Sequence, residues 1–137
     1  MAALLKEKIL QQASRRVVII VDESKLSPQL GTHSSLPVEV VPFAFQTEEN
    51  FLKSLGASVS LRVNVDESPY RTDQNNLILD AHFGPISDLK KLATLLNERA
   101  GIVEHGLFLD MASDAIVAGA QGIKHLRYGA SNEIGTI

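Results

Sequence analysis

The run from Ala2 to Lys25, AALLKEKILQQASRRVVIIVDESK, decides the fold because an amphipathic helix leads directly into a strand. Apolar residues recur at spacings of three and four and give the helix one apolar face: Ala2, Leu5, Ile9 and Ala13. Val17–Val21 is an unbroken β-branched run, typical of a parallel strand covered on both faces. Ligands of open α/β sheets bind outside the carboxyl ends of the strands. The polar cluster Asp22–Lys25 is therefore the first place to look for chemistry.

The composition is that of an ordinary globular protein and argues against several classes of function. The chain has 137 residues, 45% of them hydrophobic and 21% charged, with a formal net charge of −3. A nucleic-acid surface would need clustered lysine and arginine, and the absence of cysteine excludes disulfides and thiolate metal sites. No apolar run approaches the roughly 18 residues that span a bilayer, and the N-terminus lacks the features of a signal peptide. We expect a soluble, cytoplasmic protein that binds neither nucleic acid nor membrane.

A loop-like segment, residues 26–36, separates the first strand from a region of different character. Its sequence, LSPQLGTHSSL, contains the proline, glycine and hydroxyl residues of a domain boundary. Beyond it, Val38–Phe43 predicts a strand whose ends are marked by Pro37 and Pro42, since proline cannot donate to a sheet.

Helices and strands then alternate up to residue 109. Thr47 predicts the N-cap and Gly56 the C-cap of a short helix, with a buried face made by Phe51, Leu52 and Leu55. Regular alternation over 58–65 and 77–83 predicts two antiparallel strands, each with one wet face, connected through a polar turn at Asp73–Asn76.

A second helix and a last strand complete this region. Pro85 and Ser87 open the helix and Gly101 closes it, and its apolar stripe is Leu89, Leu92, Leu95 and Leu96. Ile102–Phe108 predicts the final strand. Residues 37–109 thus have the order β-α-β-β-α-β of a ferredoxin-like domain, with both helices on one face of an antiparallel sheet.

The predicted fold class is α/β, with two parts. Residues 1–30 and 112–128 form part of a Rossmann-like parallel α/β domain, and 37–109 form the ferredoxin-like α+β domain. In the first part, two apolar runs predict a terminal strand pair that returns to the sheet of the first strand: Ala115–Ala118 and Ile123–Leu126. The small polar tail from Gly129 onward is expected to be frayed.

Taken locally, the candidate site residues have plain structural explanations. Glu7, between Lys6 and Lys8, is most simply a solvated helix residue, since carboxylates are rarely buried. Asp22–Lys25 is most simply a charged turn, and the cluster of Asp110, Ser113 and Asp114 is most simply a solvated turn.

The histidines do not predict a metal site. They fall in four separate elements, without the i, i+4 spacing of a helical metal pair: His33, His82, His105 and His125. His82 and His105 lie on predicted strands that are able to face one another, but a surface or hydrogen-bonded role is favoured. RNA-binding by the ferredoxin-like sheet is disfavoured too, because the chain lacks strand aromatics among basic residues.

Five segments resemble type A ribose-5-phosphate isomerase in sequence, order and spacing. They are AALLKEKIL (2–10), VDESK (21–25), SSLPVEVVPFA (34–44), NNLILDAHFGPI (75–86) and GIVEHGLF (101–108). The most specific are LPVEVVPFA and the arrangement of KEK and DESK. The resemblance runs from Ala2 to about Ile123 and covers about the C-terminal half of a full-length family member.

The resemblance implies an enzyme of the pentose phosphate pathway that interconverts ribose 5-phosphate and ribulose 5-phosphate without a metal or organic cofactor. It places the family's general base, the glutamate of a Lys/Arg-Glu-Lys motif, on Glu7 and a substrate-binding lysine on Lys25. A carboxylate suits proton transfer between C2 and C1 through an enediolate. An ammonium group suits a phosphate or a developing oxyanion.

Other parts of the family pattern lie upstream of Met1. They are the phosphate-binding loop, an Asp-rich segment, a further substrate-contacting lysine, the glycine run and most of the parallel sheet. Helix 2–13 is therefore expected to expose an apolar face. Three interpretations remain: a truncated form or gene fragment, one half of a split enzyme, or a retained module with another role.

The expected function is the C-terminal portion of this isomerase. Its expected partners are a sugar-phosphate substrate and either further copies of the chain or a chain carrying the missing N-terminal half, since the small domain of the family helps to build dimers and tetramers. The alternative is a non-catalytic ferredoxin-like module for oligomerisation or partner binding.

Overall fold

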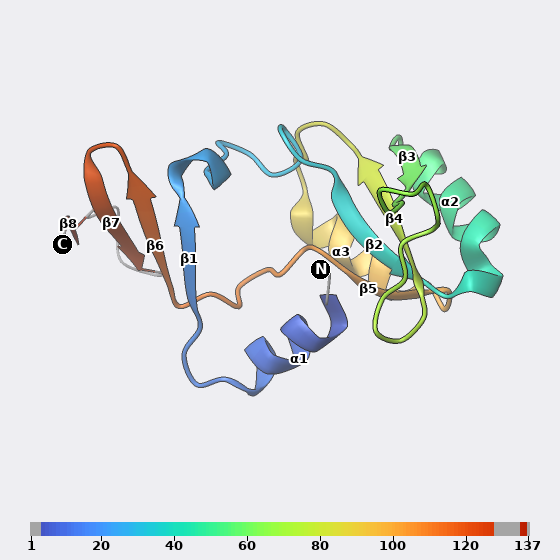
Figure 1. The fold of residues 1–137 in the computed structure, drawn as a ribbon, viewed down its shortest axis with the longest axis horizontal. Helices are drawn as coiled ribbons and strands as arrows, with labels where there is room; N and C mark the ends of the chain where they lie inside the picture. Colours follow the sequence, from blue (N-terminus) through green and yellow to red (C-terminus); the bar gives the residue numbers. More distant parts are fainter. Residues whose placement is uncertain (1–3, 128–134, 137) are drawn as a thin grey trace.

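The structure, a computed structural model, describes residues 4–127 and 135–136. Its helices are α1 (Leu4–Ala13), α2 (Phe45–Ser54) and α3 (Leu89–Asn97), with short 3-10 helices η1 (Glu23–Lys25) and η2 (Pro42–Ala44). Its strands are β1 (Val18–Asp22), β2 (Leu36–Val40), β3 (Ser58–Leu61), β4 (Leu77–His82), β5 (Ile102–His105), β6 (Asp114–Gly119), β7 (Gly122–Arg127) and β8 (Gly135–Thr136). They form two sheets, which lie towards opposite ends of the long axis (Figure 1).

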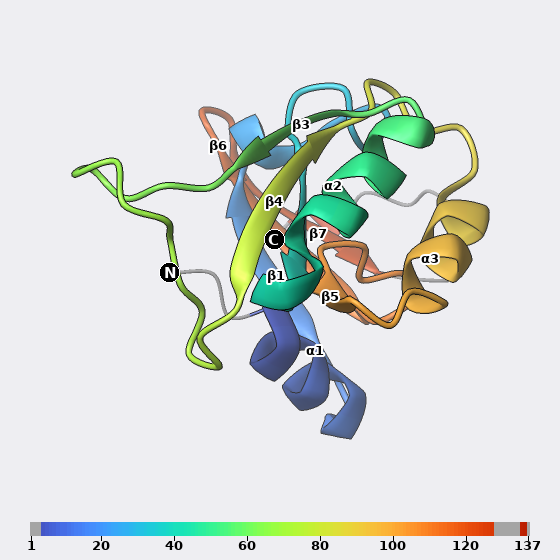
Figure 2. The same ribbon diagram turned by 90° about the vertical axis from the view of Figure 1, so that its right-hand side faces the viewer.

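The larger core belongs to the antiparallel sheet, whose strand order is β3-β4-β2-β5. With α2 and α3 inserted, this is the predicted β-α-β-β-α-β order. Both helices pack on one face of the sheet (Figure 2). There, alternating residues of β2 and β4 contact the buried residues of α2 and α3. The fully buried residues of this core are Val38, Val40, Leu52, Leu79, Ala81 and Leu96.

The opposite face of the same sheet is also covered. Ile78 and Glu39 are register partners on β4 and β2 and are 0% and 1% exposed. Glu104 of β5 is the other register partner of Glu39, and Lys8 of α1 bonds to the Glu104 carboxylate. Helix α1 therefore lies on this side, across the sheet from α2 and α3.

The second sheet has the strand order β1-β6-β7-β8, with β1 parallel to β6 and the other neighbours antiparallel. The predicted return of the terminal strand pair to the first strand is thus confirmed. The prediction that the first strand is covered on both faces is wrong. Strand β1 lies at the sheet edge, with Val18 44% and Ile20 76% exposed.

Several predicted boundaries are wrong because the helices begin elsewhere. Helix α2 begins at Phe45 after η2, so Thr47 is not its N-cap. Its C-cap is Leu55, and Gly56, the predicted C-cap, follows directly with φ +94°. Helix α3 begins at Leu89, after an Asp88 cap whose side chain accepts from the Lys91 amide at 2.9 Å. Pro85 and Ser87 therefore precede the helix.

The limits of three strands also differ from the predicted ones. Pro37 lies inside β2 rather than before it, and its carbonyl accepts from the Gly106 amide at 2.9 Å. The alternation after Ser58 continues beyond the strand, which ends at Leu61, so Val63 and Val65 are 50% and 106% exposed. The last predicted strand, 102–108, is β5 and ends at His105.

The mixed α/β fold class is confirmed, while the predicted domain limits (1–30 with 112–128, and 37–109) remain a prediction. The expectation of a frayed tail concerns residues that lie mostly outside the described part, although Gly135–Thr136 pairs with β7 as β8. Ala2 also lies outside it. No helix among the described residues is long and apolar enough to cross a membrane.

Candidate functional site

Glu7 stands on α1 between two lysines that are both engaged by the antiparallel region. Lys6 pairs with Asp73 and Lys8 pairs with Glu104. Glu7 itself is exposed, and among the described residues it has no hydrogen-bond or ion-pair partner. A free carboxylate therefore projects from a helix that its two sequence neighbours attach to the sheet.

The apolar face predicted for this helix is not the face that packs. Leu4 is 6% exposed and Lys8 7%, whereas Ile9 and Leu10 are 53% and 67% exposed. Leu4 and Lys8 are one turn apart and so lie on the same side of the helix. The expectation that the helix exposes an apolar face agrees with the exposure of Ile9.

Lys25 is placed by the turn that ends β1. The Asp22 carboxylate accepts from the Ser24 amide at 2.8 Å and caps η1. Hydrogen bonding by Ser24 holds the pKa of Asp22 below its ordinary value. A hollow of about 140 Å³ here is lined by Ser24, Lys25, Leu26, Ser27, Leu30, Gly31, His33 and Ser34. An exposed ammonium among hydroxyl groups suits an anionic ligand.

A second contact attaches this turn to the β6–β7 hairpin. The Glu23 carboxylate accepts from the Ala120 amide at 3.5 Å. It also fills the space where a Cβ at position 119 would stand, since such an atom would lie 2.2 Å from Oε2 of Glu23. Gly119 therefore permits Glu23 to lie against the hairpin, one residue before Ser24 and two before Lys25.

The structure does not bring Glu7 and Lys25 into one hollow. The turn after β1 and helix α1 are separate segments (Figure 1), and Glu7 is not among the residues that line the hollow of Lys25. Their predicted roles as base and substrate-binding residue remain predictions.

The prediction of a solvated turn at Asp110, Ser113 and Asp114 is wrong for Asp114. This residue begins β6, is 4% exposed and accepts from Arg16 at 2.8 Å, from His125 at 2.6 Å and from Arg127 at 3.4 Å. Hydrogen bonds from Arg16 and then His125 hold the pKa of Asp114 well below its ordinary range. The sequence shows no local sign of this cluster, because its members come from three separate segments.

The two strand histidines do not face one another. His82 lies on β4 and His105 on β5, and both strands pair with β2, which separates them. His82 is exposed, whereas His105 is 1% exposed and shares a hydrogen bond of 3.0 Å with Asn97. In residues 4–127 and 135–136, no group of three or more His, Asp or Glu residues is arranged to hold a metal ion.

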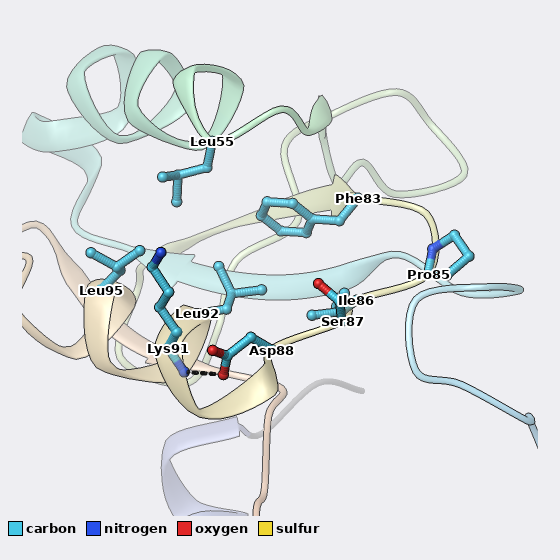
Figure 3. A pocket seen from close by; sticks show the side chains of 9 residues that line it. All are labelled: Leu55, Phe83, Pro85, Ile86, Ser87, Asp88, Lys91, Leu92 and Leu95. Carbon is cyan, nitrogen blue, oxygen red and sulfur yellow. Dashed lines mark hydrogen bonds between the residues drawn. The ribbon is translucent and has the colours of Figure 1, made fainter.

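A larger hollow, of about 430 Å³, lies between the end of α2, the end of β4 and the start of α3 (Figure 3). Its walls are mostly apolar, and Asp88 and Lys91 are its charged residues: Leu55, Phe83, Pro85, Ile86, Ser87, Asp88, Lys91, Leu92 and Leu95. The Asp88 carboxylate is already used by the Lys91 amide as a helix cap. None of the predicted site residues lines this hollow.

Comparison with known proteins gives a consistent result. The family described as ribose 5-phosphate isomerase A (phosphoriboisomerase A) matches residues 1–122. A ribose-5-phosphate isomerase A of Chloroflexus aurantiacus is 53% identical over 98% of this chain and 55% of its own length. That of Desulfatibacillum aliphaticivorans is 54% identical over 91% of this chain and 54% of its own length.

A solved D-ribose-5-phosphate isomerase in complex with phospho-erythronic acid has the same fold over the shared region. Its TM-score is 0.88 at 35% sequence identity, with 92% of this chain and 56% of that chain covered. The chain spans about half the length of the curated relatives it matches. On the family match and these identities, the chain belongs to the ribose 5-phosphate isomerase A family.

Proposed function

We propose that this chain supplies the general base, Glu7, and a substrate-binding cation, Lys25, to an isomerase that interconverts ribose 5-phosphate and ribulose 5-phosphate. The observation that carries the proposal is the free, exposed Glu7 carboxylate between two lysines whose charges are already paired. It is supported by family membership and by the KEK segment, which resembles the Lys/Arg-Glu-Lys motif that carries the family's base.

The chemistry follows from the residue types. The Glu7 carboxylate takes the proton from C2 of the open-chain aldose, and the C–H electron pair forms the C1–C2 double bond of the enediolate. Negative charge then develops on O1, where a cation or a proton donor stabilises it. The proton of the O2 hydroxyl passes to O1, and Glu7 returns its proton to C1 as the C2 carbonyl forms.

In this proposal Lys25 binds the phosphate group of the substrate. Its ammonium group lines a small hollow together with three serines and His33, and a compact point charge with three donors suits a phosphate oxygen. Glu7 is not among the residues that line this hollow. The proposal therefore requires a substrate that contacts both segments. It also requires further contacts from the part of the longer relatives that this chain does not match.

The test is turnover of ribose 5-phosphate by the purified chain, alone and with the non-matching part of a longer relative supplied as a second polypeptide. Glu7→Gln should lower kcat by about 10²-fold or more, because it removes the base and keeps the size of the side chain. Glu98→Gln is the matched control, since Glu98 is also an exposed glutamate at a helix end. Full turnover of Glu7→Gln would reject Glu7 as the base.

The alternative, a non-catalytic module for oligomerisation or partner binding, is favoured by one observation. Large apolar side chains stand exposed in both parts of the molecule: Phe43 of η2 at 101%, Val65 in the loop after β3 at 106% and Ile20 of β1 at 76%. Absence of turnover in both arrangements, together with concentration-dependent self-association in sedimentation velocity, would support this function over the isomerase.

A further inference from the structure

Lys8 is a buried lysine with three kinds of partner, all in one stretch of chain. It is 7% exposed, and its ammonium group pairs with the Glu104 carboxylate and donates to the carbonyl oxygen of His105 at 3.3 Å. The same Nζ lies 5.0 Å from the ring centroid of Phe108. The cation is therefore held by an anion, a carbonyl dipole and an aromatic face, all on β5 or just after it.

The sheet beneath Lys8 carries two neighbouring glutamates, whose negative charges a nearby cation stabilises. Glu104 and Glu39 are register partners on neighbouring strands, and like charges directly opposite one another are destabilising. Glu39 is 1% exposed, and its Oε1 accepts from Thr72 at 2.8 Å and from Asn76 at 2.9 Å. Its Oε2 has no hydrogen-bond partner among the described residues.

Removing the cation from such a site leaves buried carboxylate charge uncompensated, which is strongly unfavourable. Lys8 therefore has a strong preference for this one place on the sheet. The neighbouring pair of Lys6 and Asp73 differs, because its side chains are 54% and 41% exposed. Exposed ion pairs contribute little, so Lys8 carries most of the electrostatic anchoring of α1.

Successive residues of an α-helix project about 100° apart. Fixing Lys8 on the sheet, with Leu4 one turn earlier on the same side, therefore fixes the rotation of α1 about its axis. We propose that Lys8 is a positioning residue that sets where the Glu7 carboxylate stands relative to a bound sugar phosphate. This inference rests on the proposed role of Glu7 as the base.

The first test measures the docking of α1 without any assay of activity. The variant Lys8→Met removes the ammonium charge and keeps an unbranched side chain. In hydrogen exchange of the full chain it should speed exchange of the α1 amides by about tenfold, while exchange of the β4 amides stays unchanged. Lys6→Met is the matched control and should leave α1 exchange close to that of the parent. Unchanged α1 exchange in Lys8→Met would overturn the proposal.

If Lys8→Met unfolds the sheet, Glu104→Gln carries the same test, because it retains the lysine and its bond to the His105 carbonyl. The same pattern is expected: faster exchange confined to α1. Exchange in α1 at the parental rate in Glu104→Gln would likewise overturn the proposal.

The second test separates positioning from mere stability. In the arrangement that turns over ribose 5-phosphate, Lys8→Met should lower kcat by about tenfold with little change in KM, and Lys8→Arg should recover most of the loss. An equal rise in KM, or no recovery by arginine, would overturn positioning. The outcome is distinct from failure of the proposed function, because full activity of Glu7→Gln would reject the base while leaving the exchange result for Lys8 standing.

Discussion

The two sheets of this molecule are held together by different means. In the β3-β4-β2-β5 sheet, buried apolar side chains of β2 and β4 meet two helices on one face, and α1 packs against β5 on the other. In the described part of the β1-β6-β7-β8 sheet, Val117 is buried at 2%, but Val18, Ile20 and Ile123 are 44%, 76% and 48% exposed. The second sheet relies instead on the charge cluster around Asp114.

This difference indicates that the stability of the molecule and its candidate catalytic residues belong to different regions. Apolar burial is the main favourable contribution to folding, so the antiparallel sheet with its helices should determine the free energy of unfolding. Lys25 follows an edge strand of the thinly packed sheet, and Glu7 lies on a helix attached by ion pairs. Substitutions in the two sheets should therefore differ in their consequences.

The largest difference is expected from truncating an apolar side chain in each sheet. Leu79 is fully buried beneath α2 and α3, and Leu79→Ala should reduce the free energy of unfolding by about 3 kcal/mol through lost transfer energy and a cavity. Ile20 on β1 is 76% exposed, and Ile20→Ala should change it by less than about 0.5 kcal/mol.

Urea unfolding followed by circular dichroism measures both variants. Equal losses would show that the β1-β6-β7-β8 sheet buries Ile20 in solution, for example against another molecule. A small loss for Leu79→Ala would contradict the assignment of the stability to the antiparallel core.

A smaller effect is expected from pH, and it again concerns the antiparallel sheet. Nδ1 of His105 accepts from the Leu107 amide at 3.2 Å, so Nε2 carries the proton and donates to Asn97. Burial, with a further contribution from Lys8, lowers the pKa of His105 to about 4. The unfolded chain, with a histidine pKa near 6.5, binds more protons between these values.

The native state should therefore lose stability as the pH falls from about 6.5 towards 4, on the order of 2 kcal/mol by pH 5. Urea midpoints at pH 7.5 and 5 measure this, and His105→Gln should flatten the difference. His82→Gln is the control, because His82 is exposed on β4. If both variants keep the parental pH dependence, His105 is not its source.

Much of the antiparallel sheet was predictable because its pattern is local. Alternation of Leu77, Leu79 and Ala81 identifies the buried face of β4, and Phe51, Leu52 and Leu55 identify that of α2, as the structure confirms. Alternation does not show where a partner strand stops. Val63 and Val65 continue the pattern of β3, but its pairing with β4 ends at Leu61 opposite Leu79.

The parts that could not be predicted depend on residues distant in sequence. Asp114 resembles a turn residue until the fold brings to it Arg16, which precedes β1, and His125 and Arg127 of β7. Lys8 similarly has no local sign of burial, since its partner Glu104 lies 96 residues away. The roles of Glu7 and Lys25 are predicted by resemblance to a family alone. Taken locally, Glu7 is most simply a solvated helix residue and Lys25 part of a charged turn.

The last prediction has little effect on stability and concerns the link between the thin sheet and the turn of Lys25. In Gly119→Ala the new methyl group displaces the Glu23 carboxylate, because the two would stand 2.2 Å apart. Glu23 is exposed and flexible, and alanine is preferred to glycine within a strand, so the free energy of unfolding should change by less than about 1 kcal/mol. The change should appear instead in the amide NMR signals of Ser24 and Lys25, which the Glu23–Ala120 contact ties to the hairpin. Shifts confined to residues 118–122 would show that the turn holds its shape through the Asp22 cap alone.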